Sequence, residues 1–286
     1  MAIYNASGQI ITNVYDATEN SLTLAYDISE NPLMSGGVLL TVMTYNVGMW
    51  GYMNNQLALH QAIFNKYKPD IIGIQELGSS LPIKTVGQQA LADFSVTPSN
   101  HKNYLGMATT EDYQIANLVK ADFVNQDPAD WTNYQETRAY MMADITVGDK
   151  TVRWINTHFC LTNEYKYLQM AEILALAEQR EYVIVTGDFN AYNFESVEDD
   201  EYSQMWGIWY SNGFKCVNHQ QDGSYTKTFC GAKTATSLAD FTTPTDDIMV
   251  TSNIDIAKVT YDLTKLSYLN GNMIDHIPIV AQLVIH

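Results

Sequence analysis

Apolar residues along the chain recur with two periods, which predict strands that alternate with helices from residue 38 onward. Residues 38–47 and 70–75 are short apolar runs, which are typical of buried strands. Residues 54–67 and 164–179 have apolar side chains three or four positions apart, which predicts helices. Pro69 ends the first of these helices, because proline cannot continue the helical hydrogen-bond pattern.

The same alternation continues to the end of the chain. Further strands are expected at residues 104–107, 115–119, 138–147, 152–158, 182–186, 248–251 and 277–285, and further helices at residues 86–94 and 198–212. The turn Gly148-Asp149-Lys150 joins two of these strands as a hairpin. Many strands with hairpins and a few helices predict an α/β fold, with two layers of mixed sheet and the helices outside.

The first 36 residues differ from the rest, because they contain a short repeat. The segment that starts at Tyr15-Asp16 recurs at Tyr26-Asp27, and each copy has a glutamate and an asparagine before a leucine. Turn-forming residues next to β-forming ones favour short strands. We therefore expect residues 1–36 to form a small β-rich appendage, which packs on the main domain of residues 37–286 or docks on a partner.

Charge and hydropathy exclude some classes of protein. The 286 residues include 32 Asp and Glu but only 15 Lys and Arg, which gives a formal net charge of −17. Binding to nucleic acid through Lys and Arg alone needs a basic face, so the acidity weighs against it. The hydrophobic fraction of 46% argues against disorder. Apolar runs are too short for a transmembrane segment.

Cysteines and the N-terminus bear on the compartment. The cysteines Cys160, Cys216 and Cys230 form no CxxC pair, so a zinc cluster or a disulfide framework is not indicated. One Cys216–Cys230 bridge stays open as an alternative. The N-terminus lacks the basic and apolar segments of a secretory signal, so we expect a cytoplasmic protein, with export by another route as the alternative.

Polar side chains stand at the ends of five expected strands. They are Asn46, Glu76, His158, Asp188 with Asn190, and Asp275 with His276. Strand ends can present side chains at a sheet edge, where functional residues often lie. Taken singly, each residue has an ordinary explanation as a turn residue, a solvated cap or a core histidine. Their occurrence together, in this order, is the informative feature.

Six short motifs in this order resemble the endonuclease/exonuclease/phosphatase superfamily, which has the DNase I-like fold. The motifs are TYNV (44–47), IQE (74–76), NTH (156–158), GDFNA (187–191), DDIMV (246–250) and DHIPIVAQL (275–283). The resemblance covers residues 38–286. It implies a four-layer α/β/β/α sandwich, in which helices flank two mixed β-sheets, and it identifies residues 37–286 as a catalytic domain.

The resemblance also implies a metal-dependent hydrolase of phosphoester bonds that uses Mg²⁺, with Mn²⁺ or Ca²⁺ as alternatives. The implied metal-binding residues are Glu76, Asn46 and Asp275. Asp188 matches the aspartate that orients or deprotonates the attacking water, and His158 matches the general acid for the leaving oxygen.

Four other residues are assigned by the same comparison. His276 matches the histidine that contacts the scissile phosphate, and Asp246 matches the acid that supports it, with Asp247 as the alternative if the register is shifted by one. Asn190 and Arg138 match substrate-binding residues that contact phosphate. General chemistry agrees, because Mg²⁺ prefers oxygen ligands and a carboxylate beside a histidine favours its charged form.

Departures from one branch of the superfamily narrow the expected function. Gly48 stands where the base-excision-repair branch has an acidic ligand, and His158 stands where that branch has tyrosine. We expect a phosphodiesterase or nuclease, such as an endonuclease. The alternatives are a phosphatase, a sphingomyelinase-like lipid phosphodiesterase, or a catalytically idle binding module. The candidate substrates are nucleic acid, a nucleotide, a phospholipid head group and an inositol phosphate.

Two features outside the motifs are predicted to be structural. His219 matches no motif, and we expect it to have no catalytic role. Trp206 and Trp209 are three residues apart on an expected helix, and this spacing predicts that both belong to the core.

Overall fold

The computed structural model of the chain describes most of the main domain and the strands of the N-terminal segment. The described residues are 3–4, 10–16, 21–26, 36–48, 62–77, 89–95, 104–130, 137–191, 200–219, 225–230, 241–262 and 275–286. Within these residues, no helix is long and apolar enough to cross a membrane.

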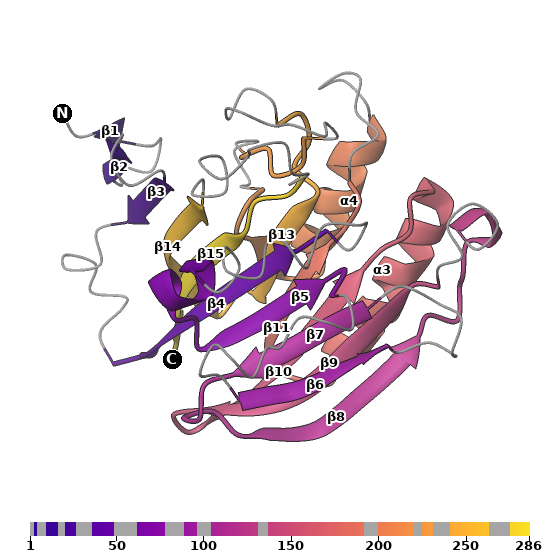
Figure 1. The fold of residues 1–286 in the computed structure, drawn as a ribbon, viewed down its shortest axis with the longest axis horizontal. Coiled ribbons are helices and arrows are strands. Elements are labelled where there is room, and N and C mark those ends of the chain that lie inside the picture. The colour runs from indigo at the N-terminus through magenta and orange to yellow at the C-terminus, as the bar shows by residue number, and fades with distance from the viewer. Residues whose placement is uncertain are drawn as a thin grey trace.

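Two mixed β-sheets form the centre of the molecule (Figure 1). In spatial order, the first sheet contains β1 (Ile3–Tyr4), β2 (Ile10–Asp16), β3 (Ser21–Tyr26), β14 (Ile254–Asp262), β15 (Ile279–Ile285), β4 (Val38–Asn46), β5 (Ile71–Gln75), β7 (Tyr104–Thr109) and β6 (Gln89–Ser95). The second contains β12 (Phe214–Cys216), β13 (Asp246–Thr251), β11 (Tyr182–Asp188), β10 (Lys150–His158), β9 (Ala139–Val147) and β8 (Ile115–Asp122). The pairs β4–β5 and β10–β11 are parallel.

Alternation along the strands creates apolar layers on both faces of each sheet. In β11, Ile184 packs in the core between the sheets, while Val183 and Val185 face the helices α3 (Asn163–Ala177) and α4 (Asp200–Ser211). Successive side chains of a strand point to opposite faces, so a continuous apolar run can serve two layers at once. Trp209 of α4 is fully buried in the outer layer, and its burial stabilises the fold by roughly 2–3 kcal/mol.

Another helical segment, at residues 62–67, covers the outer face of the first sheet. Ile63 and Phe64 of this segment pack with Met43 of β4 and Ile72 of β5. Helices thus cover the outer faces of both sheets. The four-layer α/β/β/α sandwich that the motifs imply is confirmed.

One expected helix is wrong. A helix is expected at residues 86–94, but residues 89–95 form strand β6, which pairs antiparallel with β7. Helix propensity differs by less than 1 kcal/mol between such residues, so pairing with a neighbouring strand overrides it. The strands β12 and β14 were not expected, and both pair with strands from the C-terminal third of the chain.

The N-terminal strands continue the first sheet. β2 and β3 form a hairpin, and β3 pairs antiparallel with β14 over five residue pairs from Ala25–Lys258 to Ser21–Asp262. The expected appendage of residues 1–36 is therefore joined to the main domain by backbone hydrogen bonds. Cys160, Cys216 and Cys230 are all buried and form no disulfide, so the alternative of a Cys216–Cys230 bridge is wrong.

Candidate active site

Adjacent strands of the second sheet end in register at a row of polar residues. His158 ends β10 and pairs with Asp188 at the end of β11, which in turn pairs with Asp246 at the start of β13. Neighbouring strands are about 4.8 Å apart, so this register alone brings the three side chains into one row. All three residues are buried.

The first sheet contributes residues from its two central parallel strands. Asn46 ends β4 and pairs with Gln75, the residue before Glu76, so Asn46 and Glu76 emerge side by side. The Asn46 amide Nδ2 lies 3.2 Å from Glu76 Oε1. Glu76 has a φ angle of 53°, in the left-handed region that costs a non-glycine residue about 1 kcal/mol or more. Such strain is common in functional sites.

Asp275 lies beside Gly48, the second residue after Asn46. The backbone N–H of Gly48 donates to Asn46 Oδ1 over 3.0 Å. A Cβ atom added to Gly48 would lie 3.1 Å from Asp275 Oδ1, so glycine leaves the room that this carboxylate occupies. Gly48 also has a φ of 69°, which favours glycine. Glu76, Asn46, Gly48 and Asp275 therefore form one connected group.

Asp188 Oδ2, on the second sheet, contacts side chains that come from both sheets. It accepts a hydrogen bond from Asn46 Nδ2 at 2.9 Å. It also lies 3.5 Å from His158 Nε2 and 3.6 Å from His276 Nε2. Three nitrogen atoms from three segments that are far apart in the chain thus surround one carboxylate oxygen.

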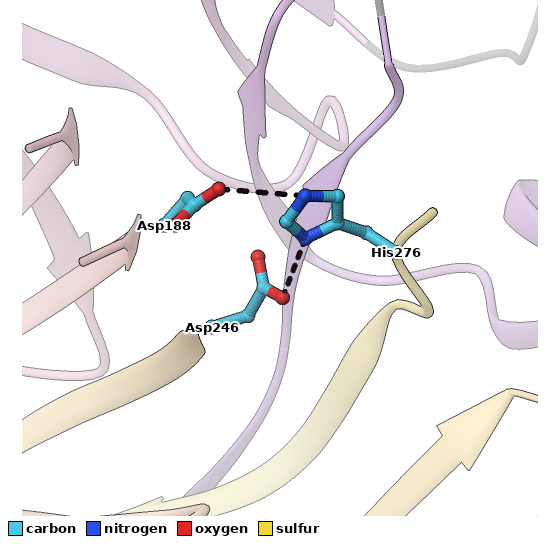
Figure 2. A group of neighbouring side chains, drawn as sticks. All are labelled: Asp188, Asp246 and His276. Atoms are coloured by element: carbon cyan, nitrogen blue, oxygen red, sulfur yellow. Dashed lines mark hydrogen bonds and ion pairs between the residues drawn. The ribbon is translucent and has the colours of Figure 1, made fainter. Parts of the chain in front are cut away.

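His276 is held between two carboxylates, as Figure 2 shows. Its Nδ1 lies 2.8 Å from Asp246 Oδ2, and its Nε2 faces Asp188. Thr245 Oγ1 donates to the same Asp246 oxygen at 3.1 Å, which fixes the carboxylate. Asp246, and not Asp247, is therefore the acid that contacts His276.

The charges in this group shift one another's pKa values. Burial, helped by the Asp246 carboxylate, raises the pKa of Asp188 to about 7, although His276 and the Asn46 hydrogen bond oppose the shift. Burial disfavours the imidazolium of His276, but Asp246 and Asp188 outweigh it and raise the pKa of His276 to about 10. Near neutral pH, His276 is charged and Asp188 can exchange its proton.

His158 has the opposite shift. Burial is the main cause, and the positive charges of Arg138 and His276 add to it, so the pKa of His158 lies well below its usual value. Its Nδ1 atom is buried and has no hydrogen-bond partner among the residues that the structure describes. His158 is therefore a neutral imidazole with one ring nitrogen facing Asp188.

Arg138 and Asn190 lie beside the row. Arg138 precedes Ala139, which pairs with His158, and its Nε donates to Asp130 Oδ2 at 2.7 Å in a buried ion pair. The backbone N–H of Asn190 donates to Asp188 Oδ1 at 2.8 Å, and Asn190 Nδ2 donates to Phe159 O at 2.7 Å. Asn190 thus fixes the orientation of the Asp188 carboxylate.

Two groups of side chains could hold a metal ion. Asp188, Asp246 and His276 offer one ligand atom each, and these atoms lie within 4.8 Å of one another. The second candidate group is Glu76, Asn46 and Asp275, which offer oxygen ligands; Asn46 Nδ2 lies at Glu76, and Asn46 Oδ1 accepts from the Gly48 N–H. Such oxygen ligands suit a hard cation such as Mg²⁺, Mn²⁺ or Ca²⁺.

A buried polar network behind the row ties the two sheets together. Gln75 Nε2 donates to Asn156 Oδ1 at 2.7 Å, and Thr186 Oγ1 donates to the same oxygen at 3.1 Å. Asn156 Nδ2 donates in turn to the backbone oxygens of Ile74 and Gly106, both at 2.9 Å. Because every member is buried, the network fixes how the strand ends of one sheet face those of the other.

Some residues at the site were not found from the sequence. Asn156 and Gln75 stand within the motifs NTH and IQE, so their motif positions were the available signal. Asp130 and the buried Lys166 have no such signal, because they lie in the helical segment at residues 128–130 and in the first turn of α3. The structure brings together all nine residues that the resemblance pointed to, and Asp247 lies apart, against His219.

Comparisons with known proteins agree with this arrangement. The family model of the Endonuclease/Exonuclease/phosphatase family matches residues 43–237, which is more than half of the chain. No curated protein sequence matches.

Several solved structures share the fold. A humanized D. rerio TDP2 matches with a TM-score of 0.65 and 16% identity, over 86% of this chain and 98% of that one. An endonuclease/exonuclease/phosphatase from Bacteroides vulgatus matches with a TM-score of 0.63 and 15% identity, over 87% and 99%. ANGEL2, a 2′,3′-cyclic phosphatase, matches with a TM-score of 0.62 and 12% identity, over 88% and 97%. At these identities the likeness concerns the fold alone. The family match and the ordered strand-end residues show that the chain belongs to the endonuclease/exonuclease/phosphatase family, whose fold is DNase I-like.

Proposed function

We propose that the protein is a Mg²⁺-dependent phosphodiesterase, which hydrolyses phosphoester bonds with Asp188 as the base. The observation that carries the proposal is the position of Asp188 Oδ2, within 2.9 Å of Asn46 Nδ2 and about 3.5 Å from two imidazole nitrogens. A buried carboxylate among nitrogen donors can accept a proton from water, while the donors contact phosphate oxygens.

Glu76, Asn46 and Asp275 would hold the ion. Their oxygens fit a hard cation, and Gly48 leaves the room that Asp275 needs. In the other possible group, Asp188 with Asp246 and His276, a metal would need a neutral His276, whose pKa of about 10 keeps it protonated near neutral pH. When bound, the ion would neutralise phosphate charge and polarise the phosphoester.

Protein side chains would supply the base and the hydrogen-bond donor to phosphate. Asp188 has a pKa of about 7, which matches a general base at neutral pH. It takes a proton from the attacking water, and Asn190 holds the second carboxylate oxygen in place. His276, with a pKa of about 10, offers a charged N–H donor to a phosphate oxygen, and Asp246 keeps its ring oriented.

The role of His158 as general acid stays a prediction. Its lowered pKa makes it neutral in the free protein. A bound phosphate would bring negative charge next to the ring and raise that pKa, because an opposite charge favours the protonated form. We therefore expect His158 to donate to the leaving oxygen only in the substrate complex.

Hydrolysis of bis-p-nitrophenyl phosphate with Mg²⁺, Mn²⁺ or Ca²⁺ tests the proposal, with EDTA as the metal-free reference. Asp188→Asn should lower kcat/KM by about 10²–10⁴, since general acid–base groups contribute that much. Asp144→Asn is the matched control, because Asp144 is also buried but pairs with Arg153 and Arg180 away from the site. Activity that survives EDTA, or equal losses in both variants, would contradict the proposal.

Metal binding can be measured without turnover. Isothermal titration with Mn²⁺ should show binding to the wild-type protein and weaker binding to Glu76→Gln. An unchanged affinity in Glu76→Gln, together with a lost affinity in Asp246→Asn, would move the ion to the other group of ligands.

A further inference from the structure

Three aromatic rings form a stack that runs from the outer layer of the second sheet to the surface. His219 lies on Trp206 of α4, with the ring centroids 3.7 Å apart and the planes at 17°. Tyr225 is stacked in turn against His219, at 5.6 Å and 27°. Trp206 and His219 are each only 4% exposed, whereas Tyr225 is 39% exposed. The stack therefore begins in the core and ends in a ring that solvent can reach.

Hydrogen bonds fix both the ring beneath Tyr225 and the backbone beside it. His219 Nδ1 lies 2.9 Å from Asp247 Oδ2, and the His219 backbone N–H donates to the same oxygen at 3.1 Å. The backbone N–H of Thr226 donates to Asn218 Oδ1, and its carbonyl oxygen accepts from Asn218 Nδ2, both at 2.9 Å. A group that stacks on Tyr225 thus meets a surface that is already ordered, so binding loses little conformational entropy.

The segment that carries Tyr225 continues to the candidate active site. Thr228 Oγ1 accepts from the backbone N–H of Asp246 at 3.1 Å, and Phe229 forms a β-bridge with His276. Tyr225 stands four residues before Phe229, so the two residues are at most about 14 Å apart along the chain. A substrate whose scissile phosphate lies at His276 can therefore reach Tyr225 with an adjoining part of the same molecule.

A lysine lies between the exposed ring and the site. Tyr225 and Lys227 are exposed, whereas Thr226 is half-buried and Thr228 is buried. In an extended segment alternate side chains point the same way, so this pattern places Tyr225 and Lys227 on one side. Single-stranded nucleic acid binds to such surfaces, because its bases stack on aromatic rings and its backbone contacts cations.

The surroundings of Tyr225 favour a planar ligand over an acyl chain. The other large apolar side chains that are exposed among the described residues lie on β4, on β8 and in or beside α3: Val38, Leu39, Val119, Val124 and Leu168. Within the described residues, Tyr225 is thus a single exposed ring beside a lysine and has no apolar patch around it. A lipid surface needs a continuous apolar area, whereas a nucleobase needs one ring.

The charge of the chain agrees with recognition by stacking. With a net charge of −17, the protein does not attract a polyanion over a long distance. Stacking of a base on an aromatic side chain contributes about 1–3 kcal/mol and does not depend on a basic surface. An acidic protein can therefore hold a short strand near its site by the bases.

We propose that Tyr225 is a stacking platform for a nucleobase of the substrate, and that Lys227 contacts the adjoining sugar–phosphate backbone. The inference rests on the proposed function, and it narrows the substrate to a nucleotide or a single-stranded oligonucleotide, in place of a phospholipid head group or an inositol phosphate. Tyr225 binds the substrate and takes no part in breaking the phosphoester bond.

Equilibrium binding with and without bases tests the platform. The two probes are a four-nucleotide strand of deoxyadenosine and the same strand with a tetrahydrofuran unit in place of each nucleoside. Both carry phosphorothioate linkages, which resist hydrolysis, so that the full-length protein can be titrated with Mg²⁺ present. Isothermal titration should show about tenfold tighter binding of the strand with bases, which corresponds to 1.4 kcal/mol.

Variants assign that ratio of affinities to its source. Tyr225→Ala should bring the ratio close to one, and Tyr225→Phe should keep it, because the ring stays. Lys227→Met should weaken both strands alike and leave the ratio unchanged, since a backbone contact does not distinguish them. Leu39→Ala is the matched control, because Leu39 is also an exposed apolar side chain but lies at the start of β4, far from Asn46 at its end.

Two results would overturn the platform: equal affinities for the two strands in the wild-type protein, or the wild-type ratio in Tyr225→Ala. A ratio that changes in Lys227→Met would overturn the backbone contact of that residue. Thermal melting shows whether each variant is folded. If Tyr225→Ala does not fold, Tyr225→Leu replaces it, and a wild-type ratio near one overturns the platform by itself.

Hydrolysis then tests the substrate class. We expect kcat/KM for d(ApA) to exceed that for sn-glycero-3-phosphocholine at least tenfold, and Tyr225→Ala should reduce the difference mainly through a higher KM for d(ApA). Equal values, or faster cleavage of glycerophosphocholine, overturn the substrate class, while cleavage of bis-p-nitrophenyl phosphate keeps the proposed function standing. If none of the three is cleaved, the proposed function fails, and the binding ratio still decides the platform.

Discussion

Two consecutive aspartates of β13 each contact the Nδ1 atom of a histidine, but the pKa values of the two histidines shift in opposite directions. Asp246 lies 2.8 Å from His276, and Asp247 lies 2.9 Å from His219. Their side chains leave opposite faces of the strand, so Asp246 faces the candidate site and Asp247 faces α4. The pKa of His276 is raised, whereas the pKa of His219 is lowered.

The difference comes from what surrounds each ring. His276 has a second carboxylate, Asp188, at its Nε2 atom, and together the two acids overcome burial. His219 is stacked on Trp206 with the ring centroids 3.7 Å apart, and burial lowers its pKa more than the hydrogen bond and charge of Asp247 raise it. A buried Asp–His pair is thus not by itself a sign of catalysis, since the second carboxylate makes the difference.

The largest expected difference between the pairs is in activity. His276→Gln should lower kcat/KM for bis-p-nitrophenyl phosphate by about 10²–10⁴, because the charged donor to phosphate is lost. His219→Gln should lower it less than tenfold in protein that is still folded. Steady-state kinetics of the two variants, with circular dichroism melts as the folding control, make the test. Equal losses would mean that both histidines serve the reaction.

The next largest difference is in stability. Trp206→Ala removes the ring that covers His219 and should lower the free energy of unfolding by about 3–5 kcal/mol, as expected for a buried tryptophan. Phe229→Ala removes the ring next to His276, with centroids 4.7 Å apart, and should cost less, since Phe229 is only partly buried. Urea unfolding measures both, and a larger loss for Phe229→Ala would reverse the comparison.

Substitution of the two aspartates should have smaller effects, on activity for Asp246 and on stability for Asp247. Asp246→Asn should lower kcat/KM about 100-fold, because the ring of His276 loses its charged support. Asp247→Asn should mainly lower stability, by about 1–3 kcal/mol, since Asp247 accepts from the backbone N–H groups of Asn218, His219 and Ile248. Kinetics and urea unfolding on the same preparations would separate the two effects.

The smallest expected effect is on how the free energy of unfolding depends on pH in acidic solution. The folded-state pKa of His219 lies below the unfolded value of about 6.5, so its contribution is complete above pH 6.5 and is lost as the pH falls. The unfolded chain then binds a proton that the folded chain does not. His158 acts in the same direction. His219→Gln should therefore reduce the slope of unfolding free energy below pH 6.5 but not remove it, and urea unfolding at a series of pH values measures it.

The strands that form the site were predictable because they are short, apolar and buried on both faces. β4, β5, β10, β11 and β13 were all expected within two residues of their observed bounds. β6 was not, because its composition favours a helix and only pairing with β7 makes it a strand. β14 lies between two other strands of the sheet, and this position could not be inferred from its sequence.

The candidate residues were predictable to the extent that they stand in motifs. Asp246 and His276 were expected to meet, and they do. Asp247 remained the alternative, because adjacent residues cannot be distinguished until the pleat of β13 is known. Asp130 was beyond prediction, since it stands in no motif and the fold alone brings it to Arg138.

The amino-acid sequence by itself determined which chemistry is available: the order of polar residues at strand ends, the apolar runs behind them and the family to which they belong. Tertiary structure alone decided how each group is charged. Two Asp–His pairs with the same local chemistry differ because pKa values depend on burial and on charges from strands far apart in the chain. The net charge of −17 illustrates the same point, since the acids that meet at this site and the cations beside them are brought together only by the two sheets.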